Sequence, residues 1–328
     1  MKAIAYTQTG PAAEVLKLVD LPTPQPGPGQ VRVRLRWSGV NPSDVKSRAG
    51  LRTKTLAFPQ IVPHSDGAGD IDAVGHGVPN SRIGQSVWVW NAAWQRPHGT
   101  AAQWVVLPAA QAVPLPAGVP GEAGACLGIP ALTALHAVLM GDGVAGKRVL
   151  VAGGAGAVGH YAVQFARKLG AAQVVASVSS EQKAQLARAA GAEATIDYKR
   201  DDVAARAAEL TEKTGFDRII EVDAAANLAT DLGALAPAGD VALYGSGAAE
   251  IALPFFPAIV RNATLRCFIV YNLASSDRER ALRTLAPLLA RGELQHNIAE
   301  RLPLEQCARA HEIVESGRAI GNVVLRID

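Results

Sequence analysis

Residues 147–159 are Lys-Arg-Val-Leu-Val-Ala-Gly-Gly-Ala-Gly-Ala-Val-Gly, a short apolar run followed by a glycine-dense turn. Gly154, Gly156 and Gly159 have the spacing G-x-G-x-x-G, which permits a tight turn, close approach of a pyrophosphate to the backbone and close packing of a helix on a strand. The free amides at the start of the helix that follows attract an anion. The stretch therefore predicts a strand, a turn and a helix that together bind a dinucleotide.

The residues after the turn support this interpretation, because a glycine-rich turn alone can be a simple connection between a strand and a helix. Val158, Ala162, Phe165 and Leu169 fall on one face of a helix. Two basic residues then precede Gly170, which is a typical stop signal. Strand, glycine turn and helix are all indicated.

The rest of the chain divides into two patterns. Up to about residue 120, short strand-like runs separated by proline and glycine predict a barrel-like β domain. From about residue 122, strands alternate with helices, which predicts a doubly wound parallel sheet with crossover helices. The expected strands after the glycine turn are 173–178, 194–198, 218–222, 241–244 and 265–271, followed by a polar-faced helix near 277–291 and a closing strand at 322–327.

Composition indicates a globular protein of two domains, with 328 residues, 49% hydrophobic and 19% charged. The 32 basic and 29 acidic residues leave a net charge of only +3, so nothing predicts binding to nucleic acid or to an anionic membrane. The alternation at 31–37 predicts a half-exposed strand with its arginines in water. No apolar run approaches 18 residues and residues 1–6 resemble a strand, so a cytoplasmic location is expected.

Three widely spaced cysteines in apolar surroundings predict buried, reduced thiols with no assigned chemistry: Cys126, Cys267 and Cys307.

The second strand of the alternating region bears on the choice of cofactor. An acid about 20 residues beyond the glycine turn binds the ribose 2′-hydroxyl of NAD, but residues 177–180 are Ser-Val-Ser-Ser. Lys183 and Tyr198, with the hydroxyls of Ser179 and Ser180, can meet a 2′-phosphate instead, which favours NADPH over NADH. Residues 179–182 also form a helix-capping box and Lys183 alone is typical of an exposed helix, so both roles remain open.

Several separated motifs now resemble one family. They are Gly39-Val40-Asn41-Pro42-Ser43-Asp44, Ser65-Asp66-Gly67-Ala68-Gly69, Gly128-Ile129-Pro130-Ala131-Leu132-Thr133-Ala134, the glycine turn, Asn227-Leu228 and Gly321-Asn322-Val323-Val324-Leu325. In this order they resemble the zinc-independent quinone oxidoreductases, the zeta-crystallin group of the medium-chain dehydrogenase/reductase superfamily, over nearly the whole chain.

The resemblance implies a GroES-like β-barrel catalytic domain built from both chain ends and a Rossmann domain between them. Residues 1–121 would begin the catalytic domain, 122–257 would bind NADPH, and 258–328 would return through the last Rossmann strands to complete the catalytic domain. It also implies NADPH in the cleft and a homodimer or homotetramer formed through the Rossmann domains.

The same resemblance assigns the cofactor-binding residues. They are Asn41, Thr133, Gly154, Ala155, Gly156, Ala157, Val158, Gly159, Ser179, Ser180, Lys183, Tyr198, Asn227, Tyr244, Gly245, Ser246, Gly247, Phe268, Ile269, Val270 and Asn322. Alternatives remain for several of them: Asn41 before Pro42 can be a turn residue, Phe268 and Val270 can be core strand, and Gly245 and Ser246 can be only a turn.

The resemblance also implies that no metal is bound at the zinc positions of the superfamily. Its alcohol dehydrogenases place Cys, His and Glu where this chain has Asn41, Ser65 and Asp66. One carboxylate cannot make a three-ligand catalytic site, and three cysteines cannot make a four-cysteine site. His64, next to one of these positions, is interpreted as a turn or hydrogen-bonding residue.

Without a metal to polarise an alcohol, the expected acceptor is already electron-poor, such as a quinone or an enone. The first functional hypothesis is the reduction of quinones by NADPH. The nearest alternative is the reduction of the double bond of an enone or enal. The alternative of another class is an NADPH-binding structural protein or an RNA-binding regulatory protein. The candidate helpers are Asn41 as an orienting group and Tyr271, with Asp44 and Lys46, which can equally form a surface ion pair.

Two features near the expected acceptor site differ from the family or allow two interpretations. Family members carry tyrosines in the loop after Asn-Pro, where this chain has Lys46 and Arg52. Trp88 and Trp90 are interpreted as β-domain core and Trp94 as the better loop candidate for an aromatic wall, while Trp104 lies in the same stretch.

Overall fold

The computed structural model describes residues 1–328, which fold into two compact units. The terminal unit comprises Met1–Pro130 and Ala286–Asp328, and the central unit comprises Ala131–Leu285. Separate clusters of buried apolar side chains lie in the two units. No helix is both long enough and apolar enough to cross a membrane.

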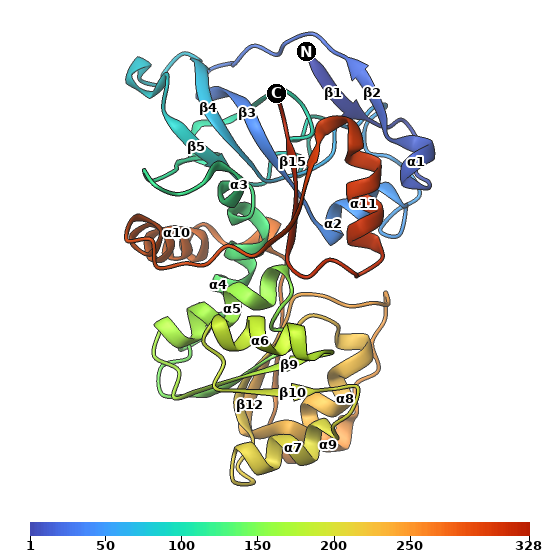
Figure 1. The fold of residues 1–328 in the computed structure, drawn as a ribbon, viewed down its shortest axis with the longest axis vertical. Coiled ribbons are helices and arrows are strands. Elements are labelled where there is room, and N and C mark those ends of the chain that lie inside the picture. The colour runs from blue at the N-terminus through green and yellow to red at the C-terminus, as the bar shows by residue number, and fades with distance from the viewer. The chain divides into compact units, whose positions relative to one another are not determined.

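The central unit is built on a parallel sheet of six strands in the order β10-β9-β8-β11-β12-β13 (Figure 1). The strands are β8 (Arg148–Val151), β9 (Gln173–Val178), β10 (Ala194–Asp197), β11 (Phe216–Glu221), β12 (Leu235–Leu243) and β13 (Thr264–Cys267). The helices of this unit are α4 (Leu132–Leu139), α5 (Ala157–Lys168), α6 (Glu181–Ala189), α7 (Val203–Leu210), α8 (Ala224–Ala234) and α9 (Phe255–Val260). The strand order reverses between β8 and β11, so the doubly wound sheet is confirmed and its switch point lies where these two strands end.

The strands of this sheet match the expected ones closely at β9 and less closely at β12 and β13. β12 begins at Leu235 rather than 241, because a bulge at 237–239, with Ala238 at φ 57°, absorbs the Pro and Gly that signalled a turn. β13 ends at Cys267 rather than 271, and residues 270–272 form a short 3-10 turn. Turn residues can therefore lie inside a strand, and an apolar run can continue beyond the residues that pair with the neighbouring strand.

The terminal unit contains a hairpin and a seven-stranded, mostly antiparallel sheet in the order β14-β15-β3-β4-β5-β7, with β6 also on β3. The strands are β1 (Lys2–Ala5), β2 (Lys17–Asp20), β3 (Gln30–Val40), β4 (Gly67–Val74), β5 (Ser86–Val89), β6 (Trp104–Pro108), β7 (Ala112–Pro114), β14 (Ile298–Pro303) and β15 (Asn322–Arg326). The helices are α1 (Ala12–Val15), α2 (Pro42–Arg48), α3 (Gly121–Gly124) and α11 (Cys307–Glu315), while α10 (Ser275–Ala290) spans the boundary between the units. β15 lies between β14 and β3, so the closing strand joins segments from both halves of the sequence (Figure 1).

Two sequence expectations in these strands can be settled. On β3, Arg34 and Arg36 are exposed and Arg32 pairs with Asp72 at 2.8 Å, which confirms the half-exposed strand. The expectation of three buried cysteines is wrong for Cys267, which is exposed at the end of the edge strand β13, whereas the other two are buried. An edge strand lacks a neighbour on one side, so an apolar local sequence does not ensure burial.

Candidate functional site

The glycine turn lies at the carboxyl end of β8, beside the switch point of the central sheet. Gly153 has a left-handed backbone with φ 65°, which favours glycine. A Cβ on Gly154 would lie 2.4 Å from the Cβ of Ala176 on β9, and one on Gly159 would lie 2.2 Å from the carbonyl oxygen of Gly153. These two glycines therefore permit the close packing of α5 against the turn and sheet.

The start of α5 fits an anion. Its N-cap is Gly156, so no side chain caps the first-turn amides, which include those of Ala157 and Val158. By contrast, Ser180 Oγ caps α6 and the Asp202 carboxylate caps α7. Uncapped amides at a helix N-terminus suit the pyrophosphate of a dinucleotide. Ala155 and Gly156 connect this helix start to the strand.

The end of β9 carries hydroxyl and ammonium groups rather than an acid. Ser177 Oγ accepts the N–H of Gly153 at 3.2 Å, which ties the turn to this strand. Lys183 Nζ donates to Ser179 Oγ at 3.0 Å, and Tyr198, after β10, is 51% exposed. The capping alternative assigned the cap to Ser179, but Ser180 is the N-cap of α6, and Ser179 Oγ accepts from the Lys183 ammonium instead. The ammonium and these hydroxyls match the chemistry of a 2′-phosphate.

A pair of buried carboxyl groups lies at the carboxyl end of β11. Glu221 Oε1 accepts the side-chain amide of Asn227 at 2.9 Å and the backbone N–H of Asp223. Glu221 Oε2 and Asp231 Oδ2 are buried without a hydrogen-bond partner from the rest of the protein, so we expect the two carboxyls to share a proton. Burial, then the neighbouring Glu221 carboxylate, raises the pKa of Asp231. Asn227 thus has its amide N–H bound to protein, and its amide oxygen remains as an acceptor.

We expect Asp231→Asn to make stability less dependent on pH. A carboxyl with a raised pKa stabilises the fold fully below its ordinary pKa of 3.8, and this contribution is lost as pH rises through the raised pKa. Asparagine keeps a donor toward Glu221 and cannot ionise, so the variant should unfold at higher urea concentration than the parent at alkaline pH. Urea unfolding across pH measures this, and a parallel pH profile in both proteins would contradict the shared proton.

The segment after β12 is tightly packed. A Cβ on Gly245 would lie 2.2 Å from the carbonyl oxygen of Val222, and the N–H of Gly247 donates to the Asp223 carboxylate at 2.7 Å. Ser246 Oγ donates to the carbonyl of Ala248 at 2.8 Å. Burial raises the pKa of the preceding Tyr244. The contacts within residues 245–248 are therefore those of a turn, as one interpretation states. This turn follows the carboxyl end of β12, so it lies at the same edge of the sheet as the glycine turn.

The expected carboxamide-binding backbone has several of its groups engaged within the protein. The N–H of Phe268 donates to the Leu243 carbonyl at 3.1 Å, and the Val270 carbonyl accepts from the Arg278 guanidinium. The ring of Phe268 meets that of His136 edge to face at 4.7 Å. Ile269, between Phe268 and Val270 in the chain, is partly buried. Thr133 and Tyr271 are buried, with 5% and 8% exposure.

In the terminal unit, Asn41 is the N-cap of α2, as its turn interpretation states, and belongs to a buried polar cluster. Its Nδ2 donates to Asp66 Oδ1 at 2.8 Å, and Asp66 Oδ2 accepts the N–H of Ile129 at 3.2 Å. Its backbone N–H donates to the Asp44 carboxylate at 2.8 Å. Burial raises the pKa of Asp44 to about 7 and that of Asp66 well above its ordinary value. The interpretation of Asp44 as half of a surface ion pair is wrong, because Asp44 is buried and its carboxylate completes the capping box of α2.

The tryptophans and Asn322 occupy different surroundings. Trp88 is 1% exposed on β5, which confirms it as core, whereas Trp94 is partly buried in a loop. Trp104 Nε1 donates to Asp72 at 2.7 Å beneath the guanidinium of Arg34. Asn322 is buried at the start of β15, and its amide donates to the carbonyl of Asn297 at 2.9 Å. Trp104 is thus engaged by polar residues on the β3–β4 sheet.

A second buried cluster was missed by sequence reasoning. His64 is fully buried with φ 77°, a conformation that costs about 1–2 kcal/mol for a residue other than glycine. Its ring lies against His311 and Cys307 of α11, and burial lowers its pKa to about 3. The interpretation of His64 as a hydrogen-bonding residue agrees with these contacts. The available signal was the spacing Cys-x-x-x-His, which places both side chains on one helix face.

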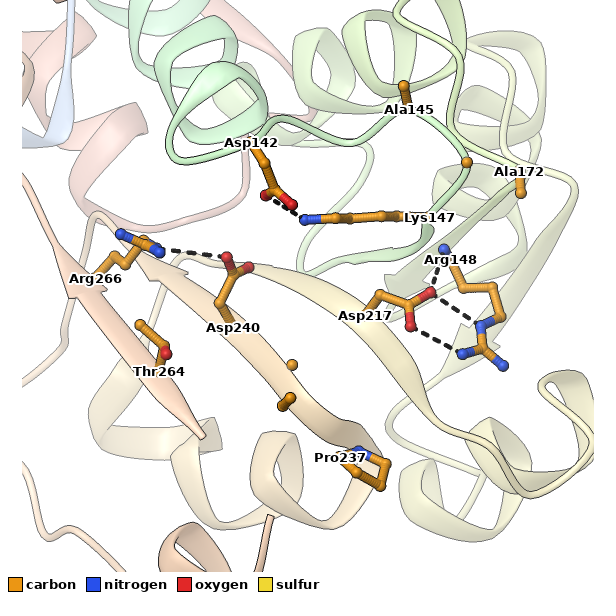
Figure 2. Close-up of a pocket in the computed structure, with 13 residues that line it drawn as sticks. Asp142, Ala145, Lys147, Arg148, Ala172, Asp217, Pro237, Asp240, Thr264 and Arg266 are labelled. Carbon is orange, nitrogen blue, oxygen red and sulfur yellow. Dashed lines mark hydrogen bonds and ion pairs between the residues drawn. The ribbon is translucent and has the colours of Figure 1, made fainter. Parts of the chain in front are cut away.

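A polar hollow of about 770 Å³ lies at the opposite, amino ends of the central strands. Figure 2 shows the residues that line it. Its charged lining is largely paired: Lys147 with Asp142 at 2.6 Å, Arg148 with Asp217 at 2.9 Å and Arg266 with Asp240 at 3.4 Å. In doubly wound sheets ligands bind at the carboxyl ends of the strands. This hollow is therefore separate from the edge of the sheet that carries the glycine turn.

Comparison with known proteins agrees with both units. Residues 27–117 match the alcohol dehydrogenase GroES-like domain and residues 157–287 match the zinc-binding dehydrogenase family. A quinone oxidoreductase of Pseudomonas aeruginosa is 31% identical and covers 99% of each chain. This chain belongs to the medium-chain dehydrogenase/reductase superfamily, alongside the quinone oxidoreductases. The expected fold, a GroES-like unit with a Rossmann unit, is confirmed.

Three further similar proteins are a 2-haloacrylate reductase, a mycobacterial protein complexed with NADPH and an alcohol dehydrogenase. A 2-haloacrylate reductase of Burkholderia sp. is 31% identical over 88% of this chain and 87% of its own. Among solved structures, mycobacterial Rv1454c complexed with NADPH has a TM-score of 0.87 with 29% identity and covers 99% of both chains. An NAD-dependent alcohol dehydrogenase has a TM-score of 0.92 with 32% identity and covers 100% of both. This medium-chain dehydrogenase/reductase is an oxidoreductase.

Proposed function

We propose that this oxidoreductase reduces quinones with NADPH and without a catalytic zinc ion. The observation that carries the proposal is the nucleotide-binding edge of the central unit, where the uncapped start of α5 lies next to a strand end with Lys183 on Ser179 and no acid. A mycobacterial relative of this fold is complexed with NADPH. When bound, NADPH supplies a hydride to an electron-poor acceptor.

The donor set of the terminal unit does not suit the catalytic zinc of the superfamily. Asn41 directs its NH₂ group toward Asp66, and that carboxylate is further bound to the N–H of Ile129. Ser65 is the third residue of the set, so only one carboxylate is present where three zinc ligands are needed. Asn41 is thereby held in a fixed orientation, which suits a positioning role toward the acceptor or cofactor.

No residue needs to act as a proton donor for a quinone, because water can supply the proton at an open site. Holding the partners in position alone can lower a barrier by about 7–11 kcal/mol in favourable cases. The similarity to a 2-haloacrylate reductase favours the reduction of activated carbon–carbon double bonds as the second candidate. An NADPH-binding or RNA-binding regulatory protein remains the third, and the near-neutral net charge of +3 counts against RNA.

The proposed homo-oligomer has one supporting surface. Helix α9, which precedes the edge strand β13 in the central unit, exposes Phe255, Phe256, Ile259 and Val260. The exposed apolar side chains of α9 and the unpaired edge of β13 each suit pairing with a second copy.

The function is tested by following NADPH oxidation with 1,4-benzoquinone, with an enone, and with no acceptor, each in buffer containing a chelator. Quinone-dependent turnover that survives the chelator is the expected result. Turnover of the enone alone would assign the protein to the double-bond reductases. Loss of quinone turnover on chelation, restored by zinc, would contradict the zinc-free proposal.

We expect Lys183→Ala to weaken NADPH binding by about 10-fold or more, because a charge-assisted hydrogen bond contributes about 1.5–3 kcal/mol. NADH lacks the 2′-phosphate, so its affinity should change little. Nucleotide binding measured by fluorescence distinguishes the two, with Lys54→Ala, an exposed lysine of the terminal unit, as the matched control. An equal loss for both nucleotides would show that Lys183 supports α6 rather than the phosphate.

A further inference from the structure

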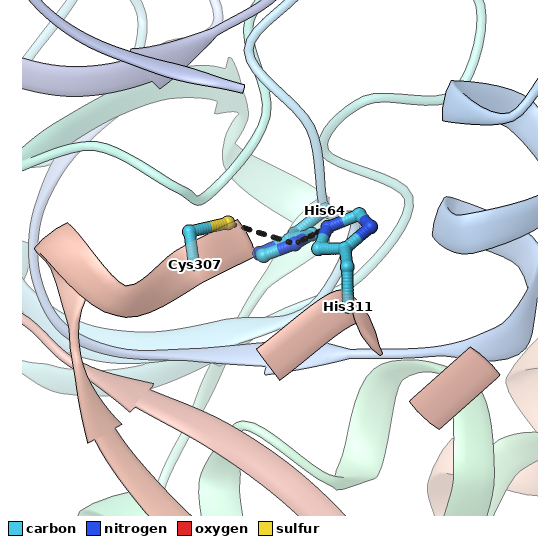
Figure 3. A group of neighbouring side chains, drawn as sticks. All are labelled: His64, Cys307 and His311. Carbon is cyan, nitrogen blue, oxygen red and sulfur yellow. Dashed lines mark hydrogen bonds between the residues drawn. The ribbon is translucent and has the colours of Figure 1, made fainter. Parts of the chain in front are cut away.

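The buried cluster of His64, Cys307 and His311 contains three metal-binding side chains outside the proposed reductase site. Figure 3 shows the two imidazole rings meeting beside the thiol, with Cys307 and His311 on one face of α11. His64 Nε2 lies 2.9 Å from His311 Nε2 and 3.9 Å from Cys307 Sγ. The three ligand atoms all lie within 4.8 Å of one another, and all three side chains are fully buried.

A chain of hydrogen bonds sets the tautomer of His64. Thr100 donates its only hydroxyl proton to the carbonyl of Asp66 at 2.7 Å, so Ser38 must donate to Thr100 at 2.8 Å. Ser38 Oγ then has no proton left for His64 and accepts from His64 Nδ1–H at 2.9 Å. The lone pair of His64 is therefore on Nε2, which faces the cluster. A histidine whose outer N–H is held in this way is typical of metal ligation.

The other two residues can present lone pairs to the same point. The His64 Nε2 lone pair accepts from His311 Nε2–H at 2.9 Å, and His311 Nδ1 is buried without a hydrogen-bond partner. Moving its proton to Nδ1 frees Nε2 as a ligand, and the Cys307 thiol becomes a ligand when its proton leaves to solvent. His64 itself occupies a left-handed backbone position that favours glycine, with φ 77°. An imidazole at such a strained position is a feature typical of functional sites.

We propose that His64, Cys307 and His311 bind one thiophilic d¹⁰ cation, Cu(I) or Zn(II), and that Cu(I) is preferred. On binding, the cation forms bonds to Cys307 Sγ and to Nε2 of both histidines, and one thiol proton is released without any change of oxidation state. Zinc in structural sites takes four ligands, whereas three protein ligands surround this point. Thiolate and imidazole are ligands that Cu(I) accepts.

Charge favours the monovalent ion. A thiolate and Cu(I) sum to zero, whereas a thiolate and Zn(II) leave a positive charge in a dry interior, which is costly. The guanidinium of Arg48 is 1% exposed and already acts electrostatically on Cys307 and His311. Arg48 is paired with Glu315 at 2.8 Å, and Asp44 is the other charged group that acts on Cys307. A second positive charge beside Arg48 would be repelled.

The geometry requires only local adjustment. Two nitrogens that share a metal at about 2.0–2.1 Å lie roughly 3.3–3.6 Å apart, so the two rings must separate by about half an ångström. The widest separation, up to 4.8 Å, must shorten by about 1 Å for a metal–sulfur bond of about 2.3 Å. Rotation of the side chains on α11 supplies both changes. Since the cluster is buried, the ion enters during folding or when α11 opens.

The test uses the full chain carrying Cys267→Ser, because the exposed thiol of Cys267 would bind copper adventitiously. This parent is titrated with Cu(I) under anaerobic conditions against a coloured Cu(I) chelator, and separately with Zn(II) against a zinc indicator. Each ligand is then removed by His64→Gly or Cys307→Ser, and Cys126→Ser is the matched control at a buried thiol elsewhere. Glycine suits the backbone of residue 64, so His64→Gly removes a ligand without adding backbone strain.

We expect one Cu(I) per chain, a rise in the unfolding temperature on loading, and X-ray absorption showing one sulfur and two nitrogen neighbours. His64→Gly and Cys307→Ser should each weaken binding by at least about 100-fold and lose the thermal shift, whereas Cys126→Ser should change neither. Binding below one equivalent, or undiminished binding in His64→Gly, would overturn the site and leave the cluster a hydrogen-bonded core. Tighter competition for Zn(II) than for Cu(I), lost in the same variants, would overturn the choice of ion.

Discussion

Gly159→Ala is expected to destabilise the central unit by about 3 kcal/mol or more, because its Cβ would overlap backbone that cannot move freely. That Cβ would lie 2.2 Å from the carbonyl oxygen of Gly153 and 2.8 Å from its carbon. Both atoms belong to the turn that connects β8 to α5. Urea unfolding measures the loss, and a variant as stable as the parent would show that the turn is less tightly packed than described.

Gly156→Ala should instead weaken NADPH binding strongly and change the stability of the fold little. The nearest atom to its Cβ is the Gly153 carbonyl oxygen at 3.2 Å, so the fold should lose less than about 1 kcal/mol. The added methyl group stands at the N-cap of α5, where we propose that the pyrophosphate binds. NADPH affinity should therefore fall by about 100-fold, since the second glycine allows the backbone to approach the pyrophosphate. Unchanged NADPH affinity in a stable Gly156→Ala protein would place the nucleotide elsewhere.

Asp240→Ala is expected to cost about 3–5 kcal/mol, because it leaves a buried cation without its counter-ion. Arg218 is fully buried, and its guanidinium donates to Asp240 and to the carbonyls of Ala137 at 2.9 Å and Met140 at 3.1 Å. The only other carboxylate paired with Arg218, that of Asp142, is 77% exposed and 4.0 Å away, so it and the carbonyls cannot balance the charge. Thermal and urea unfolding measure the effect.

Two further variants isolate the cause of this loss. Asp142 is 77% exposed, pairs with Lys147 and lies 4.0 Å from Arg218 Nη2, so Asp142→Ala removes only a solvent-screened partner of Arg218 and should change stability little. Combining Arg218→Met with Asp240→Leu removes both charges and should recover much of the loss, since buried ion pairs can often be replaced by apolar side chains. Equal losses in Asp240→Ala and the double variant would show that packing, rather than the unpaired charge, determines the effect.

The local elements of the central unit could be predicted from the sequence, because each depends on neighbouring residues. β9 begins and ends at the expected residues 173 and 178, and the glycine turn, α5 and the stop at Gly170 follow from periodicity and glycine placement. β14 and α11 were missed. The buried positions of α11 are Cys307, Ala310 and His311, which carry little apolar signal.

The clusters of the terminal unit could not be predicted, because they join residues far apart in sequence. Asn41 and Asp66 are 25 positions apart, and His64 and His311 are 247 apart. Asp44 was misjudged for the same reason: a carboxylate beside Lys46 in sequence resembles a surface pair, and only the folded chain shows it buried beneath Asn41. Non-local packing decides whether a polar residue is exposed, and a single sequence does not contain that information.

The position of β15 has a consequence for how the protein is made. This strand, at residues 322–326, fills the space between β14 and β3, so the sheet of the terminal unit stays incomplete until the ribosome has released the last of these residues. The central unit, by contrast, uses only residues 131–285 and has all its strands available earlier. The nascent chain can thus form its Rossmann unit first, while β3, although synthesised early, waits until the end for β15.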